Sequence, residues 1–181
     1  MNEDSVAPGE EAGFQFYVHM PSSGNYYERF NLVAEGQAWF NDPGLTLYLR
    51  GKTYAWQPVW QALSTGNPNI GRNQTFDVTI RALNTGDYTW YKNSGPPIRL
   101  GTSNPLNRGS GLYYCGGYCW ISDTRPASLV EDSVPPGSQG TFTFTARAPS
   151  TPGPRYEYFD LVAEGQQWFN DPGLNIYVNV L

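Results

Sequence analysis

The chain has 181 residues, among them 20 glycines and 15 prolines, and aromatic residues make up 15% of it. That composition is typical of short strands joined by tight turns and argues against a helical protein. The formal net charge is −5 and no basic run occurs, so we expect no nucleic-acid partner. No apolar stretch approaches the length that spans a bilayer, and we expect no membrane insertion.

An internal repeat organises the chain. Residues 30–48 (FNLVAEGQAWFNDPGLTLY) recur as residues 159–177 (FDLVAEGQQWFNDPGLNIY), and residues 3–16 match residues 131–144. One residue is inserted between the matches in the later copy, at Pro152. Fixed-offset similarity of this kind sets the architecture. Residues 1–51 and 131–181 therefore hold two copies of one half-unit, whereas residues 52–130 occur once.

The first copy predicts strands and turns. Phe14, Phe16 and Val18 alternate with polar neighbours, which predicts a strand with one apolar face. Residues 21–24 (PSSG) predict a turn. The apolar residues of the segment 45–49 alternate in the same way and predict the last strand of this copy.

The middle segment predicts further strands. Pro58, between tryptophans, indicates an edge strand or a linker. Alternation over residues 76–82 predicts a half-buried strand, and residues 98–100 a short one. Residues 101–111 are expected to form a loop, and residues 112–121 (LYYCGGYCWI) a hairpin.

The second copy repeats the pattern. Residues 142–146, 156–163 and 174–180 predict three strands, separated by glycine- and proline-rich turns. We expect the large aromatic residues of both copies and of the middle segment to form the core. They are Phe30, Trp39, Phe40, Trp90, Phe159, Trp168 and Phe169.

Two segments carry a family resemblance. Residues 76–90 (FDVTIRALNTGDYTW) and residues 133–169 (SVPPGSQGTFTFTARAPSTPGPRYEYFDLVAEGQQWF) together resemble the four-tryptophan immunoglobulin-like domain. That domain is known from the Next-to-breast-cancer-gene autophagy receptor and from bacterial surface proteins. Trp90, Trp120 and Trp168 look like family tryptophans, with Trp56 or Trp60 as the fourth. The resemblance implies an immunoglobulin-like β-sandwich over residues 52–181.

Residues 1–51 then correspond to the C-terminal half of such a domain. Alone, these strands could not bury their apolar faces or pair their edges. They could pack on the domain 52–181, pair with residues 52–130 in a permuted domain, or complete a sandwich with strands of another molecule. A fragment of a longer tandem array is the plainer alternative.

Cys115 and Cys119 flank a short glycine-containing segment, so the chain can double back within disulfide range. A zinc site would need further ligands, and His19 is the only histidine. We therefore expect a structural disulfide, which favours an extracellular or cell-surface location. Asn73 begins a glycosylation sequon, a tripeptide that is common by chance.

Residues for catalysis are sparse. His19 lies in an alternating segment, and the repeated carboxylates Glu35, Glu164, Asp42 and Asp171 fall in turn motifs. No spaced calcium loop and no phosphate-binding loop occurs. We expect no enzyme, no cofactor and no metal.

Two hypotheses for function follow. The first is a non-catalytic extracellular repeat of a surface, adhesive or filamentous protein, whose partners are its own copies or neighbouring repeats. The second is a carbohydrate- or peptide-binding module, because Tyr113, Tyr114, Tyr118 and Trp120 lie close together in sequence and could stack on a sugar ring.

Overall fold

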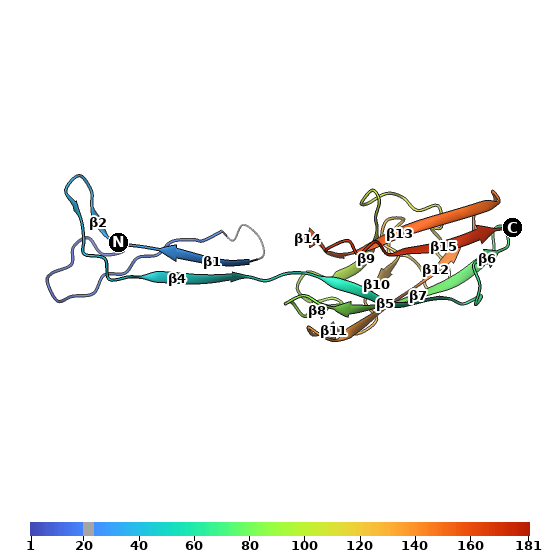
Figure 1. Ribbon diagram of the computed structural model, residues 1–181, viewed down its shortest axis with the longest axis horizontal. Helices are drawn as coiled ribbons and strands as arrows, with labels where there is room; N and C mark the ends of the chain where they lie inside the picture. Colours follow the sequence, from blue (N-terminus) through green and yellow to red (C-terminus); the bar gives the residue numbers. More distant parts are fainter. Residues whose placement is uncertain (20–23) are drawn as a thin grey trace. The chain divides into compact units, whose positions relative to one another are not determined.

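The computed structural model describes residues 1–19 and 24–181 (Figure 1). The turn predicted at residues 21–24 lies almost wholly outside the described residues. The described residues form strands and turns without a helix, so the predicted all-β class is confirmed. They divide into two compact units, Met1–Lys52 (unit 1) and Thr53–Leu181 (unit 2).

Unit 2 is built as a sandwich of two sheets, which Figure 1 shows as layers. One sheet has the order β12-β7-β5, and the other has the order β10-β9-β13-β15-β6, with β14 paired to β13. The first sheet comprises β5 (Trp56–Leu63), β7 (Thr75–Asn84) and β12 (Gln139–Arg147). The second comprises β6 (Asn69–Ile70), β9 (Ile98–Thr102), β10 (Ala127–Ser128), β13 (Gly153–Ala163), β14 (Gln167–Trp168) and β15 (Asn175–Val180). A small pair, β8 (Trp90–Tyr91) and β11 (Ser133–Val134), completes the unit.

The core of unit 2 follows the alternation read from the sequence. In β7, Val78 and Ile80 are fully buried, and in β12 so is Phe144. The Phe144 ring meets Phe159 of the opposite sheet edge to face, with ring centroids 5.5 Å apart. One face of each strand is thus apolar because it lies against the other sheet. The strands predicted at residues 76–82, 142–146, 156–163 and 174–180 are confirmed.

β5 and β12 are the two edge strands of the β12-β7-β5 sheet, and different features border them. β5 ends the sheet order, and its pairing with β7 shifts register between Pro58 and Trp60, so of the two predicted alternatives, edge strand or linker, the edge strand is confirmed. The hairpin predicted at residues 112–121 is wrong, because these residues contain no strand. They form a loop whose carbonyls accept hydrogen bonds from the N–H groups of Thr145 and Arg147 in β12. The loop therefore covers an edge that would otherwise be open.

Unit 1 contains β1 (Gly24–Arg29), β2 (Val33–Ala34), β3 (Ala38–Trp39) and β4 (Thr46–Gly51). β1 pairs with β4 and β2 pairs with β3, both antiparallel. The strand predicted around Phe14 and Phe16 is wrong, because residues 1–19 contain none. The matching segment of unit 2 is β12, which is paired with β7 over its whole length. The first copy has no segment matching β7, so its backbone lacks that partner.

The hairpin of unit 1 repeats the pairing of β13 with β15 position by position. Tyr27 lies opposite Tyr48 in unit 1, and Tyr156 lies opposite Tyr177 in unit 2. The ring centroids of each tyrosine pair are 5.0 Å apart. Because the register is the same in both units, the local sequence of the hairpin sets its strand pairing.

Backbone hydrogen bonds next to the hairpin repeat as well. The Phe30 N–H donates to the Leu45 carbonyl at 3.1 Å, and the Phe159 N–H donates to the Leu174 carbonyl at 3.0 Å. The NDPG turns are residues 41–44 in unit 1 and 170–173 in unit 2. In both, the glycine N–H donates to the aspartate side chain, at 2.7 Å in unit 1 and 2.8 Å in unit 2. The two units thus carry the same turn and the same strand entry.

Candidate functional site

Unit 1 carries an apolar groove of about 640 Å³. Its walls come from the segment before β1, from residues 30–32 after β1 and from the residues around the NDPG turn. They are Phe14, Phe16, Phe30, Asn31, Leu32, Phe40, Asn41, Pro43, Leu45, Thr46 and Leu47. We call this surface the unit 1 groove.

The matching residues of unit 2 are covered. Phe40 is 54% exposed, whereas its counterpart Phe169 is 7% exposed. Phe16 is 54% exposed, whereas its counterpart Phe144 is fully buried. The Phe16 ring still meets Phe30, with centroids 5.1 Å apart, as Phe144 meets Phe159. The groove is therefore the face that forms the core in unit 2, left open in unit 1.

In unit 2, an extended segment at the start of β5 lies against this face. The Trp56 N–H donates to Asn170 Oδ1 at 2.8 Å, and Asn170 Nδ2 donates to the Trp56 carbonyl at 3.1 Å. The Trp56 indole N–H donates to Asp160 Oδ1 at 2.7 Å. Three hydrogen bonds thus fix one tryptophan, which is 1% exposed.

Tyr54 covers the same face beside Trp56. Its ring packs on Phe169 with centroids 5.0 Å apart, and its hydroxyl hydrogen-bonds with Gln166 Oε1 at 3.1 Å. Trp90 also meets Phe169 edge to face, with ring centroids 5.8 Å apart. The cover of unit 2 is therefore aromatic and is held at defined polar points.

The groups that hold Tyr54 and Trp56 recur in unit 1. Gln37, Phe40 and Asn41 are the counterparts of Gln166, Phe169 and Asn170 and are identical to them. Asn31 stands where unit 2 has Asp160. Asn31 Oδ1 accepts the Leu32 N–H at 2.8 Å, as Asp160 Oδ1 accepts the Leu161 N–H at 2.7 Å. The acceptor oxygen at this position is therefore held in the same way in both units.

The exchange of Asp160 for Asn31 changes the electrostatics of the covered face. Burial raises the pKa of Asp160 to about 7, and nearby Asp171 also raises it. The hydrogen bonds from Trp56 and the Leu161 N–H lower the pKa, and burial outweighs them. Asn31 presents the same acceptor oxygen without a charge to bury.

The predicted core residues differ in exposure between the two units. Trp90, Phe159 and Phe169 are buried, as predicted. Trp168 and Phe30 are half-buried. Trp39 and Phe40 are exposed, so for them the core prediction is wrong, because unit 1 lacks the segment that covers their counterparts.

Trp168 contacts residues of the middle segment, whereas unit 1 contains no such segment for its counterpart Trp39 to contact. The guanidinium of Arg125 lies over the Trp168 ring, 5.0 Å from its centroid. The ring also approaches Gly101 of β9 so closely that a Cβ there would meet it at 2.5 Å. Unit 1 has no counterpart of β9, and Trp39 is 70% exposed.

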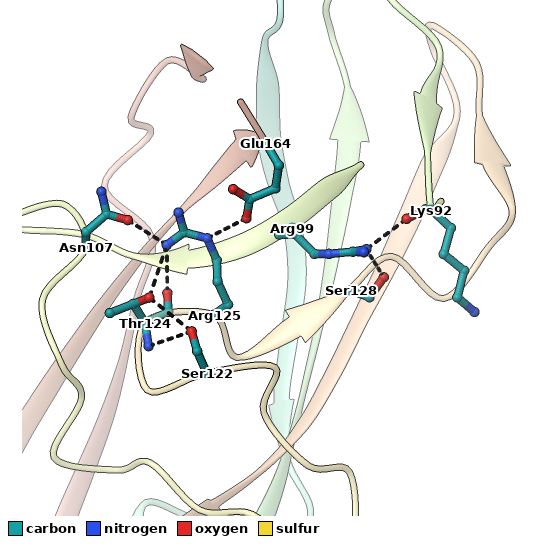
Figure 2. Close-up of polar contacts among 8 residues, drawn as sticks. All are labelled: Lys92, Arg99, Asn107, Ser122, Thr124, Arg125, Ser128 and Glu164. Carbon is teal, nitrogen blue, oxygen red and sulfur yellow. Dashed lines mark hydrogen bonds and ion pairs between the residues drawn. The ribbon is translucent and has the colours of Figure 1, made fainter. Parts of the chain in front are cut away.

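Polar contacts hold Arg125 in place, as Figure 2 shows. Arg125 Nε donates to Glu164 Oε1 at 2.6 Å, and Nη1 donates to Asn107 Oδ1 at 2.7 Å. Nearby, Arg99 donates to the Lys92 carbonyl at 2.8 Å. Glu164 thus serves an ion pair that orients Arg125 over the tryptophan ring.

The predicted disulfide between Cys115 and Cys119 is present. Tyr113 and Tyr118 are exposed near it, and Tyr114 is half-buried with the Arg147 guanidinium 5.9 Å from its ring centroid. Trp120 is buried, and its indole N–H donates to the Thr145 carbonyl at 2.7 Å. Trp120 is therefore a core residue and offers no surface for a sugar ring, which corrects that part of the prediction.

The polar residues that anchor the cover were missed by sequence reasoning. In the sequence, Asn41 and Asn170 each begin an NDPG turn motif, and Tyr54 precedes the edge strand that Pro58 indicates. The signal that could have found them is their recurrence, because the NDPG motif keeps its asparagine in both copies. Within residues 1–19 and 24–181, His, Cys, Asp and Glu form no group of three that could hold a metal ion.

Among the same residues, no helix is long and apolar enough to cross a membrane. No protein-family model matches the chain, and no curated protein sequence matches it.

Proposed function

We propose that the chain is a non-catalytic structural module of an extracellular or cell-surface protein, and that unit 1 joins it to other chains or to neighbouring repeats. The observation that carries this proposal is the unit 1 groove, because the same residue types form a closed core in unit 2. Exposed contiguous apolar surface of this kind marks interaction sites. The partners that fit are other copies of the chain or other repeats, joined head to tail or by exchange of strands.

The finer architecture belongs to this proposal. We take unit 2 as an immunoglobulin-like sandwich of the four-tryptophan type and unit 1 as a duplicate of its C-terminal half. The matched register of the two hairpins supports the duplication. The positions of Trp90, Trp120 and Trp168 in or beside the core support the family resemblance.

The location rests on the disulfide. Disulfides persist in oxidising compartments and are rare in the cytosol. Cys115 and Cys119 are bonded to each other and lie in the loop along β12, which supports a structural role outside the cell.

Light scattering on the full chain over a wide concentration range tests the proposal. We expect the mass to grow with concentration, because association removes the unit 1 groove from water. Phe40→Asp should abolish the growth, because it places a charge on the groove wall. Tyr27→Asp, an exposed aromatic of unit 1 outside the groove, is the control and should leave the growth unchanged. A strict monomer at every concentration contradicts self-assembly.

A second function is favoured by one observation. Tyr113 and Tyr118 are 44% and 59% exposed on a loop that the disulfide closes. Exposed, fixed aromatic rings are suited to stacking on sugars or on peptide side chains. If a glycan array shows binding that Tyr118→Ala abolishes, this alternative replaces assembly as the working function.

A further inference from the structure

In unit 2 the start of the middle segment (residues 52–130) covers the apolar face of the second half-unit through Tyr54 and Trp56. The residues that receive this cover recur in unit 1, where they line or border the unit 1 groove. The cover of unit 2 therefore indicates which chemistry the unit 1 groove can receive.

We infer that the unit 1 groove binds an extended aromatic segment of a partner polypeptide, with a tyrosine and a tryptophan spaced as in Tyr54-Ala55-Trp56. This inference rests on the proposed function and names the partner chemistry of the same surface. Its basis is the internal comparison, because unit 2 shows such a segment seated on the same residue types.

Unit 1 carries polar side chains at the positions that contact the tryptophan of the partner segment. Asn41 bonds the N–H and the carbonyl of this residue, as Asn170 bonds those of Trp56. Asn31 Oδ1 accepts the indole N–H, as Asp160 Oδ1 does in unit 2.

The tyrosine of the partner segment also has its contacts. Its ring lies on Phe40, as Tyr54 lies on Phe169, and its hydroxyl reaches Gln37, as Tyr54 reaches Gln166. Apolar burial supplies the affinity, and the side-chain amides fix the register of the segment.

The test uses the full chain and a labelled peptide of residues 53–61 (TYAWQPVWQ), followed by fluorescence anisotropy at concentrations where the chain is monomeric. We expect saturable binding. The peptide with Trp56→Ala should bind at least about tenfold more weakly, because it loses the buried ring and the indole hydrogen bond.

The chain variant Asn41→Ala should also weaken binding about tenfold, since it removes two hydrogen bonds to the peptide backbone. Asn25→Ala, an exposed asparagine of unit 1 outside the groove, is the matched control and should bind as the parent chain does. Backbone chemical shifts of β1 and β4 that match those of the parent chain check that both variants keep the fold of unit 1. An excess of peptide should also return any assembled chain to the mass of a monomer.

The other outcomes distinguish a failure of this inference from a failure of the proposed function. If the chain assembles and the peptide neither binds nor disperses it, this inference is wrong and the proposed function stands. If the peptide binds and Asn41→Ala has no effect, the site is elsewhere and the inference is wrong. If the chain stays monomeric and the peptide does not bind, both are wrong. If the peptide binds through Asn41 to a chain that never assembles, the inference stands without self-assembly.

Discussion

The two half-units place nearly the same sequence in two surroundings. Both form the hairpin with the same register and close the same NDPG turn. The two half-units differ at the positions that the middle segment contacts in unit 2. Phe169 is buried, whereas its counterpart Phe40 is exposed. β12 is a strand, whereas the matching residues within 1–19 form none. Local sequence therefore sets the hairpin, whereas the strand and the core need a partner.

The largest expected effect comes from removing the cover in unit 2. Trp56→Ala should destabilise unit 2 by about 3–5 kcal/mol, because it empties a fully buried site. Trp60→Ala is the control on the same strand, since Trp60 is 48% exposed and has the Arg81 guanidinium over its ring. We expect it to cost less than about 1 kcal/mol. Urea unfolding measures both, and equal costs would contradict the role given to Trp56.

The second prediction changes the same residue in each copy. Phe169→Ala should cost about 3 kcal/mol or more of the free energy of unfolding of unit 2. Phe40→Ala should change the unfolding of the chain by less than about 0.5 kcal/mol, because its ring is exposed. The pair is compared by urea unfolding at a concentration where the chain is monomeric. A large cost for Phe40→Ala would mean that unit 1 is covered within the chain.

The third prediction sharpens the comparison of Asp160 with Asn31. The pKa of Asp160 is raised to about 7 in the folded state, so folded unit 2 keeps a proton that the unfolded chain releases. The free energy of unfolding should therefore fall as the pH rises from about 4 to about 7. Asp160→Asn should flatten this fall and stabilise unit 2 at pH 8, because the asparagine keeps the acceptor oxygen and buries no charge.

Urea unfolding at pH 5, 6, 7 and 8 measures this effect in the parent chain and in Asp160→Asn. Asp123→Asn is the control, because Asp123 belongs to a loop and not to the covered face. Its profile should match that of the parent. A parent profile that rises with pH over this window contradicts the burial of a carboxylate at residue 160.

The smallest expected effect concerns the loop along β12. The double variant Cys115→Ser, Cys119→Ser opens a short covalent loop, and the loss should be about 2 kcal/mol or less. Thermal unfolding measures it, with the reduced parent chain as the control. Because the loop covers the edge of β12 and unit 1 has no such loop, the hydrogen exchange of β1 and β4 should not change.

The parts of the fold that sequence reasoning predicted are those with local signals. Alternation located β7, β12 and β15, and Pro58 located an edge. The same rule failed at Phe14 and Phe16, because alternation describes a strand only where a neighbouring strand supplies hydrogen bonds. The hairpin predicted at residues 112–121 was wrong for a different reason, because this loop accepts hydrogen bonds from β12 instead of pairing with itself.

The candidate site was less accessible to sequence reasoning. The repeat predicted a half-unit that cannot bury its apolar face alone, but the prediction that Phe40 lies in the core was wrong. The polar anchors were not predicted, since Trp56 and Asn170 are 114 residues apart and no local pattern joins them. Asp160 reads as an ordinary polar residue of a strand until the structure places it under Trp56.

Native-state hydrogen exchange of the full chain, measured at dilution and residue by residue, tests the central claim most directly. We expect strong protection in the β13–β15 hairpin and weak protection in the β1–β4 hairpin, although their registers match. Protection in unit 1 should rise when the peptide of residues 53–61 is added. Equal protection of the two hairpins at dilution, unchanged by the peptide, would contradict the claim that unit 1 is an open copy of a closed half.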